Sequence, residues 1–186
     1  MALRDLDLPR KLTYEDYVLF PEDGLRHEIL DGEHYVTPAP FVRHQLISSN
    51  LHILLGSFIR RRRAGKLFSA PTDVILSPHD IAQPDLFFIS NERIGIVTEP
   101  NVQGAPDLVI EILSKRTRRR DERLKLERYD RFEVREYWIV DPEHQGAKVY
   151  RRDDRGLRLV TELSIADAFT TPLLPGLEIP LAEIFE

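Results

Sequence analysis

The sequence has no cysteine among its 186 residues, which excludes disulfides, thiol catalysis and cysteine-bound zinc. It also has no apolar stretch approaching the length of a membrane span, and residues 1–7 lack the apolar centre of a signal peptide. Lys and Arg are absent after Arg158, although acidic residues continue to Glu186. These absences lead us to expect a cytoplasmic protein without membrane contact, whose charge is polarised along the chain.

The length and composition fit one globular domain. The chain is long enough for one full core and too short for two comparable ones. A net charge of −5 argues mildly against nucleic-acid binding, but the basic residues are concentrated in two blocks, 60–66 and 115–125. We therefore expect a single domain over residues 1–186 that can still present a basic surface.

The spacing of apolar residues predicts an α/β fold. The helical period is clearest over residues 41–63, where Gly65 is expected to end the helix, and a second helix is expected over 117–132. A hairpin is expected over 25–37, with its turn at Asp31 and Gly32. Strands are expected near 66–76, 84–90, 107–113, 136–140, 147–151 and 157–163. The order is helix, three strands, helix, strand, with additions at both ends.

Two acidic residues stand in apolar strands. Glu111 lies inside the run LVIEIL (residues 108–113), in which both alternating faces are otherwise apolar, as in a strand covered on both sides. Asp85 opens a second such run, DLFFI. An ionised carboxylate in such a place costs several kcal/mol unless a cation or hydrogen bonds compensate it. The pair therefore predicts a metal site, because Mg²⁺ is usually held by one or two carboxylates with waters and substrate oxygens.

A metal-dependent phosphodiesterase also needs a cation beside the attacking water. Lys125 is the first candidate, because Asp121, Lys125 and Tyr129 share one face of the second predicted helix. Lys115 is the competitor, since it shares strand parity with Glu111 if the strand continues that far.

The chain resembles the PD-(D/E)xK nuclease superfamily and, within it, the bacterial Uma-type (Uma-two) family of restriction-endonuclease-like proteins. The resemblance covers roughly residues 12–180. It rests on the stretches 28–33 (EILDGE), 43–45 (RHQ), 83–85 (QPD), 104–114 (GAPDLVIEILS), the Asp121, Lys125 and Tyr129 series, and 134–142 (VREYWIVDP).

This resemblance implies a restriction-endonuclease-like αβββαβ core and cleavage of DNA with Mg²⁺, or Mn²⁺ in its place, often by a homodimer. It assigns Asp85 and Glu111 to the metal, with the carbonyl of Ile112 as a further ligand, and Glu28 as an extra catalytic acid. The superfamily's lysine would stand two residues after Glu111, where this chain has Leu113, so Lys125 on the next helix takes that role. His44, Lys115 and Arg118 are candidate substrate contacts.

Structural alternatives exist for each of these residues. Asp85 can be a turn residue after proline, Glu111 can pair with Arg43 or Arg118, and Lys125 can be a solvated helix lysine. The arginines at 60–63 favour a solvated helix end, where cations interact well with the helix dipole. For the whole protein, the alternatives are an inactive nucleic-acid-binding or partner-binding module of the same fold, and an enzyme acting on another phosphate or small-molecule substrate.

Overall fold

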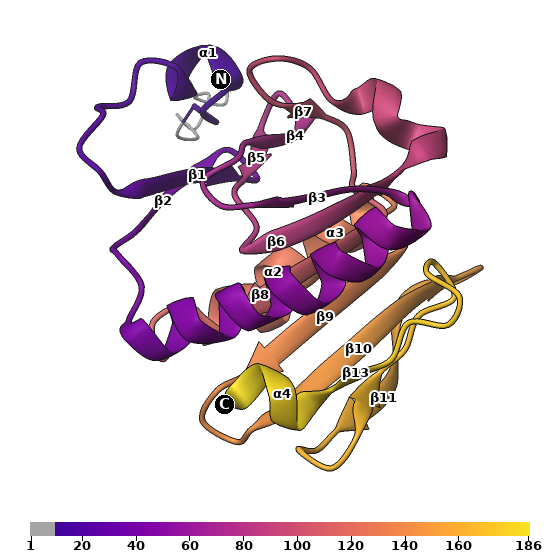
Figure 1. Ribbon diagram of the computed structural model, residues 1–186. Helices are drawn as coiled ribbons and strands as arrows, with labels where there is room; N and C mark the ends of the chain where they lie inside the picture. The colour runs from indigo at the N-terminus through magenta and orange to yellow at the C-terminus, as the bar shows by residue number, and fades with distance from the viewer. Residues whose placement is uncertain (1–9) are drawn as a thin grey trace, which may run out of the picture.

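The computed structural model describes residues 10–186 and shows a mixed α/β fold around a central six-stranded sheet (Figure 1). In spatial order its strands are β11 (Gly156–Leu163), β10 (Gly146–Asp153), β9 (Glu136–Asp141), β8 (Leu108–Ile112), β6 (Leu86–Ser90) and β3 (Gly65–Ser69). Only β8 and β9 run parallel, while the other neighbours in this sheet are antiparallel. Residues 1–7, for which the sequence predicts no signal peptide, lie outside the described residues.

A smaller sheet lies beside the central one and contains the predicted hairpin. Its order is β2 (Glu33–Thr37), β1 (Arg26–Leu30), β5 (Asp80–Ala82), β4 (Val74–Ser77) and β7 (Val102–Gln103). The hairpin turns at Asp31 and Gly32, both with positive φ, as the sequence predicts. A short pair, β12 (Ala168–Phe169) and β13 (Ile179–Pro180), completes the strands of the described residues.

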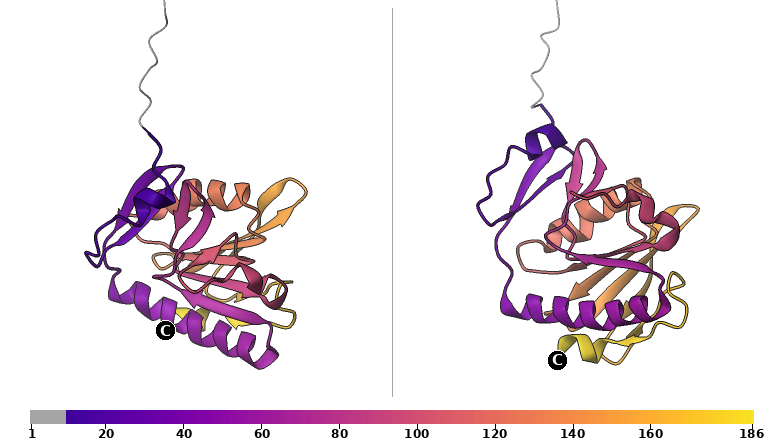
Figure 2. Two further views of the ribbon diagram at one scale, coloured as in Figure 1. Left: turned by 90° about the horizontal axis from the view of Figure 1, so that it is seen from above. Right: turned by 45° about the horizontal axis from the view of Figure 1, so that its top comes forward.

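Helices cover both faces of the central sheet (Figure 2). The helices of the described residues are α1 (Tyr14–Tyr17), α2 (Val42–Arg62), the 3₁₀-helix η1 (Asn91–Ile96), the π-helix η2 (Arg120–Lys125), α3 (Leu126–Arg131) and α4 (Leu181–Phe185), of which α2 and α3 lie on opposite faces of the central sheet (Figure 2). The long helix α2 buries Leu51 and Leu55 against Ile110 and Ile112 on one face of β8. Tyr129 of α3 packs with the opposite face of the sheet, the face from which Glu111 projects.

The fold prediction is confirmed, with two local corrections. The single strand expected at 66–76 is wrong: the chain leaves the central sheet after Ser69 and re-enters the smaller sheet at Val74. Gly65 does not end α2, because Arg63 already takes the left-handed conformation there (φ 52°) and Gly65 opens β3. None of the helices within residues 10–186 combines the length and the apolar run that a membrane crossing needs.

Candidate active site

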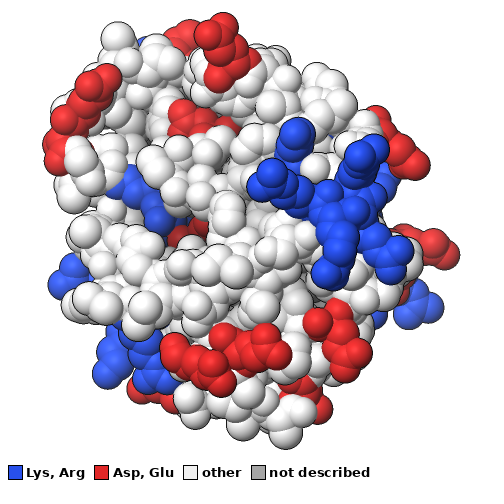
Figure 3. All heavy atoms as spheres, in the orientation of Figure 1, with Lys and Arg blue, Asp and Glu red and all other residues white. Residues whose placement is uncertain are grey.

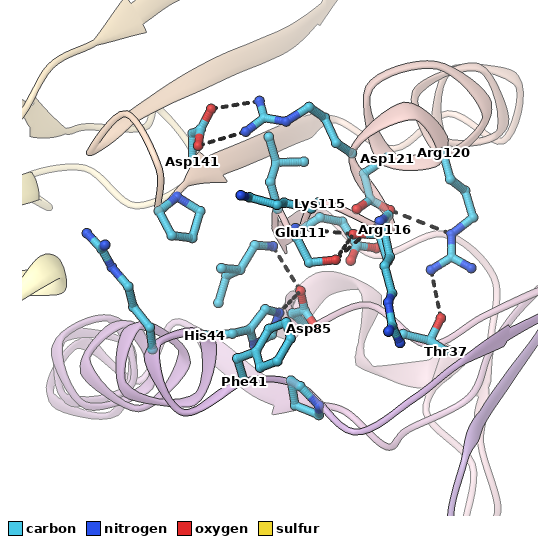
Figure 4. A pocket seen from close by; sticks show the side chains of 18 of the residues that line it. Thr37, Phe41, His44, Asp85, Glu111, Lys115, Arg116, Arg120, Asp121 and Asp141 are labelled. Atoms are coloured by element: carbon cyan, nitrogen blue, oxygen red, sulfur yellow. Dashed lines mark hydrogen bonds and ion pairs between the residues drawn. The ribbon is translucent and has the colours of Figure 1, made fainter.

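A pocket of about 500 Å³ opens between the N-terminal end of α2, the segment after β2 and the η2 helix (Figure 4). Asp85, Glu111, Asp121 and Lys125 all line it. Seven Lys or Arg side chains and five Asp or Glu side chains form its wall, so the pocket has an excess of positive charge. An anionic molecule is therefore the favoured occupant.

Register places Asp85 opposite Glu111. Strands β6 and β8 pair antiparallel, with Leu86 across from Ile110. The residue before Leu86, Asp85, therefore faces the residue after Ile110, Glu111. The backbone N–H of Ile112 donates to Asp85 Oδ2 at 2.8 Å, which ties the carboxylate to β8. The two acids that the sequence singles out therefore meet at one point of the sheet.

Two side chains contact Asp85 from other elements. Arg26 of β1 donates to Oδ1 at 2.7 Å, and His44 Nε2 of α2 lies 3.1 Å from Oδ2. Burial alone would raise the pKa of Asp85, but the hydrogen bond and charge of His44, together with Arg26, hold it well below its ordinary value. Asp85 is therefore a carboxylate in this pocket.

Lys125 lies between two buried acids. Its Nζ is 2.8 Å from Glu111 Oε1 and 2.8 Å from Glu28 Oε1, and Lys125 is only 1% exposed. Tyr129 donates its hydroxyl to the same Glu111 oxygen at 2.8 Å. Although burial opposes the charged form, Glu111 and Glu28 raise the pKa of Lys125 above its ordinary value, so the ammonium is retained.

The η2 helix brings Lys125 to this position. A π-helix is wider than an α-helix and is often found at functional sites. Here it places Lys125 and Asp121 on the buried side, with Lys125 Nζ 3.9 Å from Asp121 Oδ1. The expected close pairing of Lys125 with Asp121 is therefore secondary, and Glu28 and Glu111 are its closer partners.

Glu28 reaches Lys125 from the hairpin but does not itself line the pocket. The backbone N–H of Gln83 donates to Glu28 Oε1 at 2.9 Å, and Arg120 lies 3.4 Å from Oε2. The hairpin is fastened to the helix by Arg128, 3.0 Å from Asp31. Hence β1 contributes Glu28, β8 contributes Glu111, and η2 contributes Arg120, Asp121 and Lys125 to the same cluster of charges.

The acidic groups of this cluster outnumber its cations. Burial raises the pKa of Glu111 to about 8; Lys125 acts against this, and the carboxylates of Asp85, Asp121 and Glu28 add to it. Burial likewise raises the pKa of Asp121 to about 6. Glu28 Oε2 and Asp121 Oδ1 are buried oxygens without a hydrogen-bond partner among the described residues. Such oxygens favour an additional cation or its waters.

The donor set fits a hard divalent cation. Within residues 10–186, no three acidic or imidazole side chains converge closely enough to hold an ion by themselves. Mg²⁺ does not require this, because it keeps several waters and binds through one or two carboxylates. Asp85 and Glu111, with the carbonyl of Ile112 beside them, are the residues that would hold it.

The remaining predicted contacts lie around the pocket. His44, Lys115 and Arg118 all line it, but Arg118 is engaged by Asp141 in a two-bonded pair at 2.8 and 3.0 Å. Strand β8 ends at Ile112, so Lys115 lies in a turn and does not continue the strand toward Glu111. Glu111 pairs with Lys125, and neither Arg43 nor Arg118 takes that place.

Sequence reasoning did not single out Arg26, nor the contact of Arg120 with Glu28, although Arg120 belongs to the basic block at residues 115–125. Arg26 carried a usable signal, because it shares strand parity with Glu28 and so points to the same side of β1. Arg120 carried none, since its direction depends on the π-helical turn that follows it.

The basic block at residues 60–66 lies away from this pocket. Arg60 and Arg63 belong to the end of α2 opposite His44, roughly 25 Å away at 1.5 Å per residue. Figure 3 shows Lys and Arg side chains gathered over this end of the helix. The two basic blocks of the sequence therefore form separate surfaces.

Comparison with known proteins gives a family and a fold. A family model described as "Uma2: Putative restriction endonuclease" matches residues 14–182. A crystal structure described as a "putative nuclease belonging to DUF820" from Anabaena variabilis is similar, with a TM-score of 0.77 and 20% identity over 94% of this chain and 97% of that chain. At that identity the likeness shows the shared fold. No curated protein matches the chain.

Proposed function

The chain belongs to the Uma2 family, and from this premise we propose that it is a metal-dependent endonuclease that hydrolyses DNA phosphodiester bonds. One observation carries the proposal: Asp85, Glu111 and Lys125, taken from three separate segments, line one basic pocket, and the buried Glu28 contacts Lys125 from a fourth segment. Acids fit a metal ion, and the basic wall fits a polyanion.

Asp85 and Glu111 would hold Mg²⁺ or Mn²⁺, which when bound offsets phosphate charge and lowers the pKa of a coordinated water. Lys125 has three N–H donors, and its two carboxylate contacts at 2.8 Å leave one donor to orient the attacking water. Glu28 keeps Lys125 charged and in place. His44 and Arg26 orient Asp85 through their contacts with its two oxygens.

The test is cleavage of DNA by Asp85→Asn and Glu111→Gln. We expect either substitution to abolish Mg²⁺-dependent cleavage while circular dichroism shows a folded protein. The matched control is Glu136→Gln, which changes a buried acid of the same sheet that bonds to Trp138 and Thr171 and does not line the pocket. Wild-type cleavage by Asp85→Asn or Glu111→Gln would show that the site is wrong.

Calorimetric titration with Mg²⁺ and Mn²⁺ separates the enzyme from an inactive module. The proposal expects binding that is lost in Glu111→Gln and kept in Glu136→Gln. A wild-type protein that binds neither ion up to millimolar concentration and cleaves no DNA would favour the inactive module.

A further inference from the structure

Phe41 is exposed where phenylalanines normally are not. All nine phenylalanines of the chain lie within the described residues, and Phe41 alone among them is exposed, at 74%. Burying an aromatic ring is among the larger favourable contributions to the free energy of folding. Phe41 contributes little of this kind because its ring stays in solvent. The ring is therefore available for contact with another molecule.

The backbone holds Phe41 at the mouth of the pocket. Phe41 is the N-cap residue of α2, with an extended backbone (φ −69°, ψ 157°), and it follows Pro38 and Pro40. Both prolines restrict the backbone, so the ring has a fixed point of attachment. It lines the same pocket as His44 and Asp85 (Figure 4).

The surroundings of Phe41 are cationic. Arg43, Lys115 and Arg116 line the pocket with it; all three are exposed and have no acidic partner within residues 10–186. Unpaired cations favour phosphates, whereas an aromatic ring favours the face of a nucleobase. A phosphate-binding wall with one exposed ring fits a nucleic acid better than it fits an apolar protein partner.

We propose that Phe41 stacks on the base of an unpaired nucleotide whose neighbouring phosphate is bound by the cations Arg43, Lys115 and Arg116. In a continuous duplex the base faces are covered by their neighbours, so a ring beside these phosphate-binding cations meets only the sugar-phosphate edge. A single strand or a frayed end offers its bases freely. The substrate class is therefore DNA with unpaired nucleotides, an inference that rests on the proposed nuclease function.

The experiment measures the affinity of the full chain for a fluorescently labelled 16-nucleotide single strand and for the matching duplex, in EDTA so that neither is cleaved. We expect Phe41→Ala to weaken single-strand binding by about tenfold, the effect of losing one stacked base, and to leave duplex binding within about twofold. Phe41→Tyr keeps a ring and should bind like the wild type. A 5-iododeoxyuridine strand should photocrosslink to Phe41 in the wild type.

Val42→Ala is the control, because Val42 is the next residue, is 76% exposed and does not line the pocket. Single-strand binding by Phe41→Ala equal to that of the wild type would overturn the inference, as would an equal loss in Val42→Ala. In both cases wild-type DNA binding and cleavage would persist, and the proposed nuclease function would stand. A wild-type protein that binds neither strand form would remove both proposals together.

Discussion

At the scale of single residues, Lys125 is the most consequential side chain of the site. It is the cation between Glu28 and Glu111, all three are almost fully buried, and each acid oxygen lies 2.8 Å from its Nζ. Removing one partner of a buried ion pair leaves an uncompensated charge, which costs far more than losing a surface pair.

We expect Lys125→Met to lower the free energy of unfolding by about 3–5 kcal/mol, because two buried carboxylates lose their cation. Adding Glu28→Gln and Glu111→Gln should recover most of this loss, although not the cleavage activity. Urea denaturation measures both effects. Lys148→Met is the control: Lys148 pairs with Glu122 at 3.0 Å with a side chain 38% exposed, so we expect a loss below about 1 kcal/mol. Equal losses in the two lysine variants would contradict the buried-pair account.

At the scale of elements, helix α2 ends at a non-glycine residue, Arg63, whose backbone is in the left-handed conformation. Arg63 has φ 52° and ψ 39°, the left-handed region that glycine adopts at little cost. Its side chain is exposed and has no acidic partner among the described residues, so little packing opposes its replacement.

We expect Arg63→Gly to raise the free energy of unfolding by about 0.5–1 kcal/mol, since glycine removes the clash of Cβ with the backbone. Arg62→Gly, one residue earlier and still helical, should instead lower it by about 1 kcal/mol. Thermal and urea unfolding of the two variants would decide the matter. A loss of stability in both would mean that the helix does not end at Arg63 in solution.

Elements also show which parts of the structure could be predicted from the sequence. The long helix α2 followed from its apolar period, and β8 followed from a run with two apolar faces, because burial imposes these patterns directly. The break between β3 and β4 was missed, since both halves read as strand and only the smaller sheet separates them. The π-helical turn was missed as well, because its extra residue leaves no periodic trace in six residues.

The residues of the candidate site also differ in how far the sequence alone predicts them. Asp85 and Glu111 were evident as acids in apolar strands, a local conflict that a single sequence displays. The helix face that Lys125 shares with Asp121 and Tyr129 made it a candidate, but the resemblance to a family was needed to favour it over a solvated lysine. Strand parity places Arg26 on the same side of β1 as Glu28, but its contact with Asp85, 59 positions away in the chain, depends on the packing of the hairpin, which no local pattern reports.

At the scale of the whole molecule, the two basic blocks should differ in their effect on DNA. Lys115 and Arg116 line the pocket, whereas Arg60 and Arg61 lie at the far end of α2, a helix about 30 Å long. Each cation that contacts a phosphate displaces a counterion and so contributes about one unit to the salt dependence of binding.

We expect Lys115→Ala with Arg116→Ala to weaken duplex binding and to lower the slope of log K against log salt by about two. Arg60→Ala with Arg61→Ala removes the same charge from the other surface and should leave the slope unchanged. The measurement is a titration of labelled duplex DNA with each variant in EDTA, at salt concentrations from about 50 to about 200 mM. The slopes of the two variants are then compared with that of the wild type. A larger change in the second variant would place DNA on the α2 end instead.

The position of Lys125 on a helix has a consequence for how this protein can change over generations. The lysine stands 14 residues from Glu111, with a turn and a π-helix between them, so their meeting depends on the number of residues in that segment. One codon gained or lost within Arg120–Lys125 would turn the lysine by about 100° away from its acids. Descendants of that kind would keep Glu28, Asp85, Glu111 and Lys125 in the sequence but would lose the cluster that these residues form. A survey that counts these four residues alone would not distinguish such chains from this one.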